Sequence, residues 1–216
     1  MLEFNLSDNN RCVWIGIGTD IPKESNLYAE CVSINKLLSE KYGNSILFSE
    51  AKMQLPHLNF YDLNVLKKNL DEISLKIDHL VSGIRSFDVK VKSINYFPFG
   101  LFFLKIENTS VLSNLHKLIV EAVSPLKENC ICEDYLQLHR KYNLTQKSML
   151  KLHGNPYVLS QFIPHVTLGL TQAKNLRLIK KEIRPILTDF VLKVKNIHIV
   201  VELDRKKIIM ADFDLK

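Results

Sequence analysis

The second half of this chain repeats the first, and this internal duplication limits the possible folds more than any other feature of the sequence. The repeated segments keep one order: GNSILFSE, LPHLN and FDVKVKSI (from Gly43, Leu55 and Phe87), then GNPYVLSQ, IPHVT and FVLKVKNI (from Gly154, Ile163 and Phe190). A duplicated unit predicts two related half-domains, and each functional group of one half should reappear in the other.

Each half can be divided into strands and helices by its hydrophobic pattern. Runs of β-branched and aromatic residues predict strands, whereas apolar residues at a spacing of three or four predict helices. The predicted strands are 12–18, the two His-bearing segments, 87–97, 101–107, 190–203 and 207–215. The predicted helices are 26–43, capped at Ser25 or Asn26, then 64–79, 113–123 and 174–187.

Repeated units of this kind predict an α+β fold with two pseudo-symmetric lobes, each a mainly antiparallel sheet with outer helices. A central cleft would carry one H-x-[T/N] motif from each lobe. We expect a single bilobal domain over 1–216, with lobe 1 at about 11–97 and lobe 2 at about 101–203. The segment 124–160 has no counterpart in the first half and is predicted to be an insertion near the cleft, as a loop, short helices or a lid.

The composition narrows the class of protein. The N-terminus has no basic region followed by an apolar run, and no segment approaches the ~18 apolar residues of a membrane span. The four cysteines, Cys12, Cys31, Cys130 and Cys132, lack the spacing of a zinc site and are expected to be reduced thiols of a cytoplasmic monomer. The net charge of +6 favours an anionic partner such as a phosphodiester.

The two His-bearing strands contain the candidate site. Alternate residues of a strand point to the same face, so His57 projects with Asn59, and His165 projects with Thr167. A lone histidine in an apolar strand is more often a core residue than a catalyst. Its repetition, with a preceding proline and a polar residue two positions later, favours the functional interpretation.

Two imidazoles that face each other across a cleft can act as general base and general acid on opposite sides of one phosphorus atom. An unperturbed pKa of ~6.5 makes either protonation state accessible near neutrality. Asn59 and Thr167 can donate hydrogen bonds to the non-bridging phosphate oxygens, whose charge grows in the transition state. We therefore predict His57 and His165 as catalytic and Asn59 and Thr167 as phosphate-binding, with no metal ligands and no cofactor.

These motifs resemble those of the two-histidine (2H) phosphoesterase superfamily, which includes 2′-5′ RNA ligase-like proteins and cyclic phosphodiesterases. PHVTLGL matches the family pattern H-x-T-x-x-L completely, whereas PHLNFYDL has Asn59 where Thr or Ser is usual. The resemblance covers most of the chain, from Cys12 to about Asp214. It implies metal-independent cleavage of 2′,3′-cyclic phosphates or 2′-5′ linkages, with RNA ends or small nucleotides as substrates.

Two other functions fit the same motifs. Asn59 is compatible with an RNA-binding module that keeps the fold but has weak or no catalysis. Alternatively, the insertion could select a cyclic or 2′-5′-linked signalling nucleotide.

Three further residues are candidates for substrate contact. One is Tyr61, which is expected on the same face as His57. The others are the basic-aromatic pair Arg140 and Tyr142.

Overall fold

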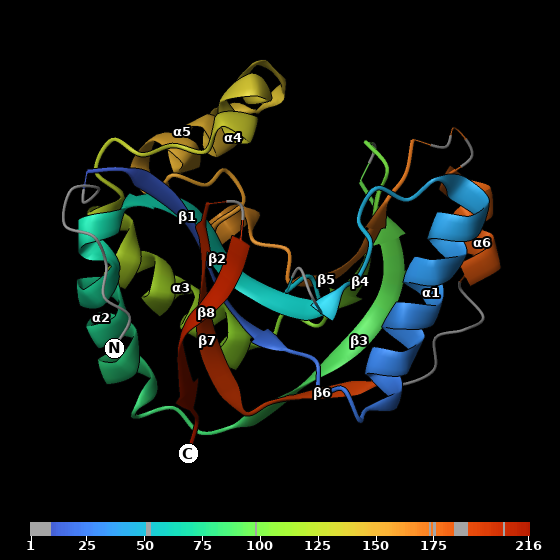
Figure 1. Cartoon of the computed structure of the whole chain (residues 1–216), viewed down its shortest axis with the longest axis horizontal. Helices are drawn as coiled ribbons and strands as arrows, with labels where there is room; N and C mark the ends of the chain where they lie inside the picture. The colour runs from blue at the N-terminus through green and yellow to red at the C-terminus, as the bar shows by residue number, and fades with distance from the viewer. Residues whose placement is uncertain are drawn as a thin grey trace.

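The computed structural model describes residues 10–50, 53–97, 99–172, 174, 176–183, 190–204 and 206–216. Within these residues, eight strands form one antiparallel sheet in the order β6-β3-β4-β5-β2-β1-β7-β8 (Figure 1). The strands are β1 (Cys12–Asp20), β2 (His57–Leu66), β3 (Phe87–Tyr96), β4 (Leu101–Ile106), β5 (His165–Leu170), β6 (Val191–Val194), β7 (Asn196–Leu203) and β8 (Lys206–Asp214). The predicted α+β class and mainly antiparallel sheet are confirmed.

The connection between β6 and β7 requires the sheet to curl. These strands are six positions apart in the sheet, which would separate them by roughly 29 Å if the sheet were flat. The single residue Lys195 joins them, and one residue spans at most about 3.6 Å. The sheet therefore bends until its ends approach, and Figure 1 shows β6 running directly into β7. The single strand expected over 190–203 is thus two strands with different partners.

The helices cover the outer side of this curled sheet. The α-helices are α1 (Asn26–Tyr42), α2 (Leu70–Val81), α3 (Ser110–Val123), α4 (Glu133–Gln137), α5 (Leu144–His153) and α6 (Leu176–Ile183), with 3-10 turns η3 (Lys67–Asn69), η4 (Ser124–Lys127), η5 (His139–Lys141) and η6 (Leu159–Gln161). The helices α2 and α3 pack together beside β2, whereas α1 packs on β5 and α6 on β3. Figure 1 shows the two groups on opposite sides of the molecule.

The two sequence repeats exchange elements in space. Strand β3, from the first repeat, lies between β6 and β4 of the second, and β7 of the second lies against β1 of the first. Helix α1 likewise belongs to the first repeat but packs on β5. Each half of the sheet is therefore built from both repeats, which ties the two histidine strands to one common core.

Helix α1 begins and ends as its sequence predicts. The Ser25 hydroxyl accepts a hydrogen bond of 3.1 Å from the amide of Tyr28, and the helix ends at Gly43, whose φ of 65° suits a residue without a Cβ. The repeat-related Gly154 ends α5 with a φ of 76°. The GN dipeptides of the two repeats therefore stop two helices in the same way.

The helix expected over 64–79 begins later than predicted. Strand β2 continues to Leu66, where it pairs with Cys12, and α2 starts only at Leu70. Leu63 and Val65 alternate with Asn64 in burial, which is a strand pattern that the helical assignment overlooked. The predicted helix over 174–187 is confirmed as α6, and its last part, 184–187, lies outside the described residues.

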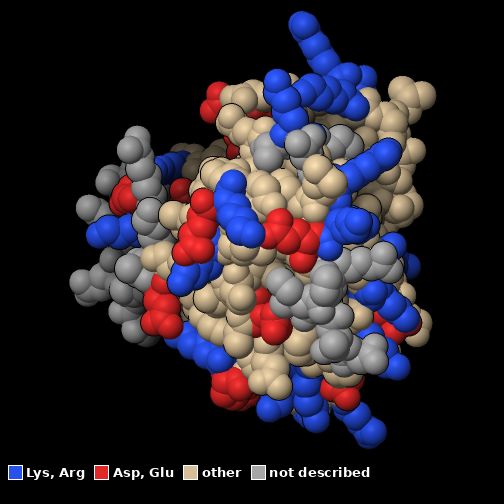
Figure 2. Space-filling model, turned by 90° about the vertical axis from the view of Figure 1, so that its right-hand side faces the viewer, with Lys and Arg blue, Asp and Glu red and all other residues tan. Residues whose placement is uncertain are grey.

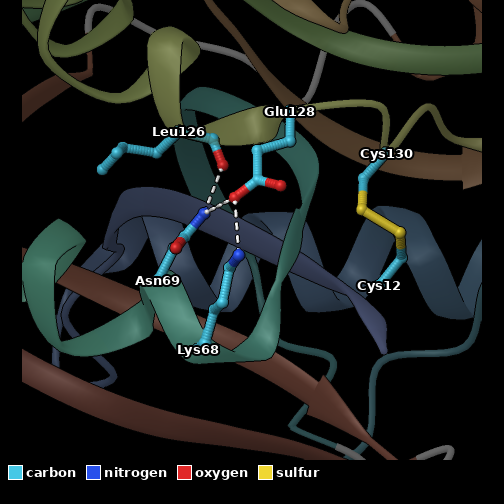
Figure 3. A network of polar contacts seen from close by, with 6 residues as sticks. All are labelled: Cys12, Lys68, Asn69, Leu126, Glu128 and Cys130. Carbon is cyan, nitrogen blue, oxygen red and sulfur yellow. Dashed lines mark hydrogen bonds and ion pairs between the residues drawn. A yellow bond between two sulfur atoms is a disulfide. The ribbon is translucent and has the colours of Figure 1, made fainter. Parts of the chain in front are cut away.

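The expectation of four reduced thiols is wrong for two of the cysteines. Cys12 at the start of β1 and Cys130 in the insertion form a disulfide, whereas Cys31 and Cys132 are free (Figure 3). Because 118 positions separate the bonded cysteines, only the tertiary structure brings them together. The disulfide joins the base of the insertion to the start of β1, an interior strand of the sheet.

A polar network anchors the same part of the insertion (Figure 3). The amide of Asn69 donates to the Leu126 carbonyl at 2.8 Å and to a carboxylate oxygen of Glu128 at 3.2 Å. Lys68 lies 3.2 Å from the same carboxylate oxygen. With the disulfide, these contacts hold the start of the insertion against the junction of β2 and α2, from which α4 and α5 rise above β1 and β2 (Figure 1).

The surface over α1 and α6 mixes both signs of charge. Figure 2 shows acidic and basic side chains interspersed there, with basic side chains gathered at the top of the view, the end at which Figure 1 places α4 and α5. Lys41 of α1 and Glu182 of α6 are paired at 2.5 Å, which neutralises charge locally. No helix among the described residues has the length and apolar character to cross a membrane.

Candidate active site

The two histidine motifs lie on neighbouring strands at the centre of the sheet. Leu58 of β2 pairs with Val166 of β5 in an antiparallel register. This register places His57 opposite Thr167 and Asn59 opposite His165, so each imidazole faces the polar residue of the other motif. Leu58 and Val166 are fully buried on the core face, and the four polar residues occupy the opposite face.

Both histidines make the same hydrogen bond to their own chain. The Nδ1–H of His57 donates to the Leu55 carbonyl at 2.7 Å, and that of His165 donates to the Ile163 carbonyl at 2.7 Å. A carbonyl oxygen can only accept, so the proton of each neutral ring resides on Nδ1. Each Nε2 is thereby left to exchange a proton, and the proline between carbonyl and histidine, in both motifs, helps to shape this contact.

Both motifs also contain a β-bulge three residues after the histidine. In β2, Gly18 pairs with Asn59 but Ile17 pairs with Tyr61, so Phe60 is the additional residue. In β5 the additional residue is Leu168. A bulge shifts the alternation of faces, so the fifth residue after each histidine returns to the histidine face. That residue is Asp62 in β2 and Leu170 in β5.

Asp62 is the centre of a polar cluster beside Asn59. Its carboxylate accepts hydrogen bonds from the Asn59 amide at 2.9 Å, the Tyr135 hydroxyl at 2.8 Å and the Asn155 amide at 3.2 Å. Burial raises the pKa of Asp62, and hydrogen bonds from Tyr135, Trp14 and Asn59 partly oppose this effect by stabilising the ionised form.

The repeated asparagines bind the two histidine strands at equivalent positions. The Oδ1 of Asn44 accepts from the amide of Leu170 at 2.8 Å, and the Nδ2 of Asn155 donates to the Asp62 carbonyl at 3.0 Å. Each Oδ1 also accepts from the amide two residues further along its own chain. Both asparagines are buried, and each holds one histidine strand just beyond its bulge.

A cleft of about 310 Å³ contains the two motifs. It is lined by His57, Asn59, His165 and Thr167 together with Asp62, Asn155 and several aromatic side chains. The aromatic side chains of this cleft are Trp14, Phe60, Tyr61, Phe97, Phe99, Tyr135, Tyr157 and Phe162. Phe97 and Phe99 stack with centroids 5.4 Å apart, and Phe97 also contacts His165 edge-on at 6.0 Å. Such a lining provides flat surfaces for nucleobases on both sides of the polar residues.

The environment of the cleft lowers the pKa of both histidines. Burial is the largest cause for each, opposed by the hydrogen bonds to the Leu55 and Ile163 carbonyls. A positive charge on His57 also lowers the pKa of His165, which places the two imidazoles within electrostatic range of each other. The environment of the cleft therefore favours the neutral, proton-accepting form of both rings.

His198 of β7 is buried and lies near His57, on the other side of β1. A smaller adjoining pocket is lined by both residues and by Asp20. The Nδ1 of His198 is 3.7 Å from a carboxylate oxygen of Asp20. His198 lowers the pKa of His57 and Asp20 raises it, so these neighbours tune the catalytic candidate in opposite directions.

His116 contacts two of the segments that form the cleft. Its Nδ1–H donates to the Phe60 carbonyl at 2.7 Å, its Nε2 accepts from the amide of Leu159 at 2.8 Å, and its ring stacks on Phe162 at 3.8 Å. Burial lowers the pKa of His116 to about 4, so the ring is neutral at physiological pH. This histidine joins the bulge of β2 to the segment that leads into His165.

The remaining predicted contact residues have different positions. Tyr61 lines the cleft but, because of the bulge, does not share the face of His57; its side chain is buried and its hydroxyl donates to the His153 carbonyl. Arg140 is exposed on η5 and is not among the described residues that line the cleft. Tyr142 lies behind Tyr157, with ring centroids 5.9 Å apart.

Sequence reasoning missed Asp62 and the residues that the insertion contributes, Tyr135, Asn155 and Tyr157. A bulge has no clear signature in β2, so strict alternation assigned the cleft face to Tyr61 instead of Asp62. The one available signal was the repeated GN dipeptide, which matched Asn155 to Asn44. Tyr135 belongs to the part of the insertion that has no repeat partner, and Tyr157 aligns with Ile46, so the repeat gave no polar counterpart for either.

Comparisons with known proteins agree with this geometry. A family model described as the 2′-5′ RNA ligase superfamily matches residues 44–206, which include both histidine motifs. A search of curated proteins found no match.

Solved structures with the same fold were also found. TT0787 of Thermus thermophilus is 16% identical with a TM-score of 0.62, covering 94% of this chain and 97% of that protein. LigT of E. coli in apo form is 10% identical with a TM-score of 0.55, covering 95% and 99%. LigT complexed with 3′-AMP is 10% identical with a TM-score of 0.52, at the same coverage.

Proposed function

Because this chain belongs to the 2′-5′ RNA ligase superfamily, within the 2H phosphoesterases, we propose that it cleaves a 2′,3′-cyclic phosphate or a 2′-5′ phosphodiester of RNA or of a small nucleotide. The observation that carries this proposal is the register of β2 and β5, which sets each histidine opposite the polar residue of the other motif. A phosphate held over this face of the two strands would meet one imidazole and one hydrogen-bond donor from each strand.

In this mechanism, one histidine removes a proton from water through its unprotonated Nε2. The water oxygen attacks phosphorus, and the bond from phosphorus to a ribose oxygen breaks. The other histidine, protonated at Nε2, donates its proton to that ribose oxygen, so that the pair ends with its protons exchanged. Hydrogen bonds from Asn59 and Thr167 to the non-bridging oxygens stabilise the charge that develops on them.

The near-symmetry of the site lets either His57 or His165 serve as the base, and the acid and base roles exchange when the reaction runs in reverse. No step requires a metal ion, so we propose metal-independent catalysis. Aromatic side chains around the cleft support a nucleotide substrate, and the binding of 3′-AMP by LigT is consistent with one. Because Arg140 lies outside the cleft, it would contact only an RNA that extends beyond the scissile phosphate.

The experiment is cleavage in the presence of a chelator, with nucleoside 2′,3′-cyclic phosphates, a 2′-5′-linked oligoadenylate and its 3′-5′-linked isomer as substrates. We expect the wild type to cleave at least one of the first two classes, and His57→Ala and His165→Ala each to lower kcat by about 100- to 10,000-fold. His79→Ala, an exposed histidine on α2, is the matched control.

Loss of activity in the chelator would refute the metal-independent mechanism. Binding of these nucleotides without cleavage, unaffected by His57→Ala, would instead support the alternative of a binding module.

A further inference from the structure

Asn59 differs from Thr167 in what it can present to a phosphate. A hydroxyl can rotate to donate, but an amide has a donor end and an acceptor end that differ by a half-turn about its last bond. If the Oδ1 of Asn59 faced the phosphate, its partial negative charge would repel the negatively charged phosphate oxygens. An asparagine at this position can therefore bind phosphate well only if a neighbouring group holds its orientation.

Asp62 is such a group. Its Oδ1 lies 2.9 Å from the Nδ2 of Asn59, and a carboxylate can only accept, so Nδ2 is the end that faces it. One N–H of the amide is used in this contact, and the second N–H has no other partner among the residues that the structure describes. Because the bulge at Phe60 brings Asp62 to the histidine face, the contact depends on that bulge.

Asp62 is itself held by the insertion. The Tyr135 hydroxyl of α4 donates to its Oδ2 at 2.8 Å, and Asn155, which follows α5, donates to its carbonyl at 3.0 Å. A third contact of 3.2 Å joins the Asn155 amide to the Tyr135 hydroxyl. The carboxylate therefore has donors on both oxygens and little freedom to turn away from Asn59.

The other half of the site shows the contrast. Thr167 replaces Asn59, and the position equivalent to Asp62 is Leu170, which cannot accept a side-chain hydrogen bond. The threonine half lacks an acidic partner at this position, and the asparagine half has one. The two halves therefore differ at both positions: one half has Asn59 with Asp62, and the other has Thr167 with Leu170.

We propose that Asp62 is a positioning residue, which fixes the amide of Asn59 so that its free N–H donates to a non-bridging oxygen of the phosphate. The proposal rests on the phosphodiesterase function above. It makes the insertion part of the catalytic apparatus, because Tyr135 and Asn155 hold Asp62 in place. It also accounts for an asparagine where the family pattern has threonine or serine.

A double-mutant cycle tests the proposal. Asp62→Leu copies the residue of the other half, and it is made both in the wild type and in Asn59→Thr. In the wild type we expect kcat to fall by about 10- to 100-fold with little change in KM, as for residues that orient a functional group. In the Asn59→Thr background, where no amide has to be oriented, the same change should alter kcat by no more than about twofold.

An equal loss of kcat in both backgrounds would overturn the proposal, because Asp62 would then act independently of Asn59. Tyr135→Phe removes one hydrogen bond from Asp62 and keeps the ring, so it covers the case in which Asp62→Leu does not fold. We expect Tyr135→Phe to lower kcat in the wild type and to leave it unchanged in Asn59→Thr. All folded variants are assayed at a temperature well below the lowest of their melting temperatures, so that differences in stability do not affect the measured kcat.

A second readout does not depend on turnover. The side-chain amide signal of Asn59 in a ¹⁵N NMR spectrum should shift when inorganic phosphate is added to the wild type, and the shift should weaken in Asp62→Leu. If no phosphodiester is cleaved but this difference is found, the proposed function fails and the positioning role stands. If cleavage is found but the phosphate-dependent shift is the same in both proteins, the positioning role fails alone.

Discussion

Leu58 and Val166 face each other at the centre of the sheet, and this one pair determines how the two histidine motifs meet. Because the strands are antiparallel, the flanking residues cross over: His57 stands opposite Thr167 and His165 opposite Asn59. Each half of the site therefore takes its imidazole from one repeat and its nearest hydrogen-bond donor from the other. A shift of one residue in this register would turn the two polar side chains of one strand into the core and separate them from the other pair.

The pH dependence of kcat/KM should have its maximum below pH 6.5. Burial lowers the pKa of both His57 and His165 from 6.5. Activity rises as pH passes the pKa of the base and falls as pH passes that of the acid, and both values belong to the free enzyme. A bound phosphate favours imidazolium, so the maximum for kcat should lie at a higher pH than that for kcat/KM.

These two profiles are measured by initial rates from pH 4.5 to 9, in buffers of constant ionic strength. A kcat/KM that is still rising above pH 7.5 would contradict the lowered pKa values.

Thr167→Val should lower kcat by about 100-fold, because it removes a donor to the transition state while preserving the shape of the side chain. The KM should change less than kcat, since the charge on the non-bridging oxygens is greatest in the transition state. Thr145→Val, on the exposed surface of α5, is the control. A rise in KM at unchanged kcat would show that Thr167 only binds the substrate.

His116 should make the protein less stable as the pH falls. Its folded pKa of about 4 lies below the unfolded value of 6.5, so the unfolded state binds the additional proton between these values. Its contribution is fully present above pH 6.5 and is lost as the pH falls toward 4, by up to about 3 kcal/mol.

The measurement is the free energy of unfolding in urea at several pH values, for the wild type and His116→Gln. The variant should be less stable than the wild type at pH 7.5, and the difference should shrink by pH 4.5. Parallel curves for the two proteins would show that His116 does not titrate in this range.

Loss of the Cys12–Cys130 disulfide should reduce the free energy of unfolding by about 2–4 kcal/mol, because the bond closes a long loop in the unfolded chain. Cys130→Ser should reproduce the effect of a reductant, and the reductant should have no further effect on that variant. Cys132→Ser, two residues away and free in the structure, is the control. Non-reducing peptide mapping should recover Cys12 and Cys130 in one linked fragment.

The same reduction should lower kcat and raise KM together. The disulfide and the contacts of Glu128 hold the base of the insertion. The insertion supplies Tyr157, which lines the cleft, and Tyr135 and Asn155, which hold Asp62 beside Asn59. An unchanged kcat and KM after reduction would show that the insertion keeps its place without the bond.

Much of this site follows from local physical rules that the sequence displays. The strand period of two places His57 beside Asn59 and His165 beside Thr167, and the repeat predicts that the two pairs belong together. The cap at Ser25 and the glycine at position 43 likewise determine the limits of α1, because both act within one turn of the chain.

Other features depend on contacts between distant segments, which no local pattern records. The bulge at Phe60 exists because β2 pairs with β1, and it replaces Tyr61 by Asp62 on the face of the site. The break at Lys195 likewise reflects two different pairing partners.

The sequence by itself determined the repeats, the strand and helix types and the four polar residues of the motifs, since these depend on side-chain period and composition. Only the tertiary structure decided the order of the strands, the opposition of His57 to Thr167, the disulfide and the support of Asn59 by Asp62 and Tyr135. These are relationships between residues that meet only when the sheet curls and the insertion packs against it. Their free energy comes from burial and pairing in the folded chain, which a linear pattern does not contain.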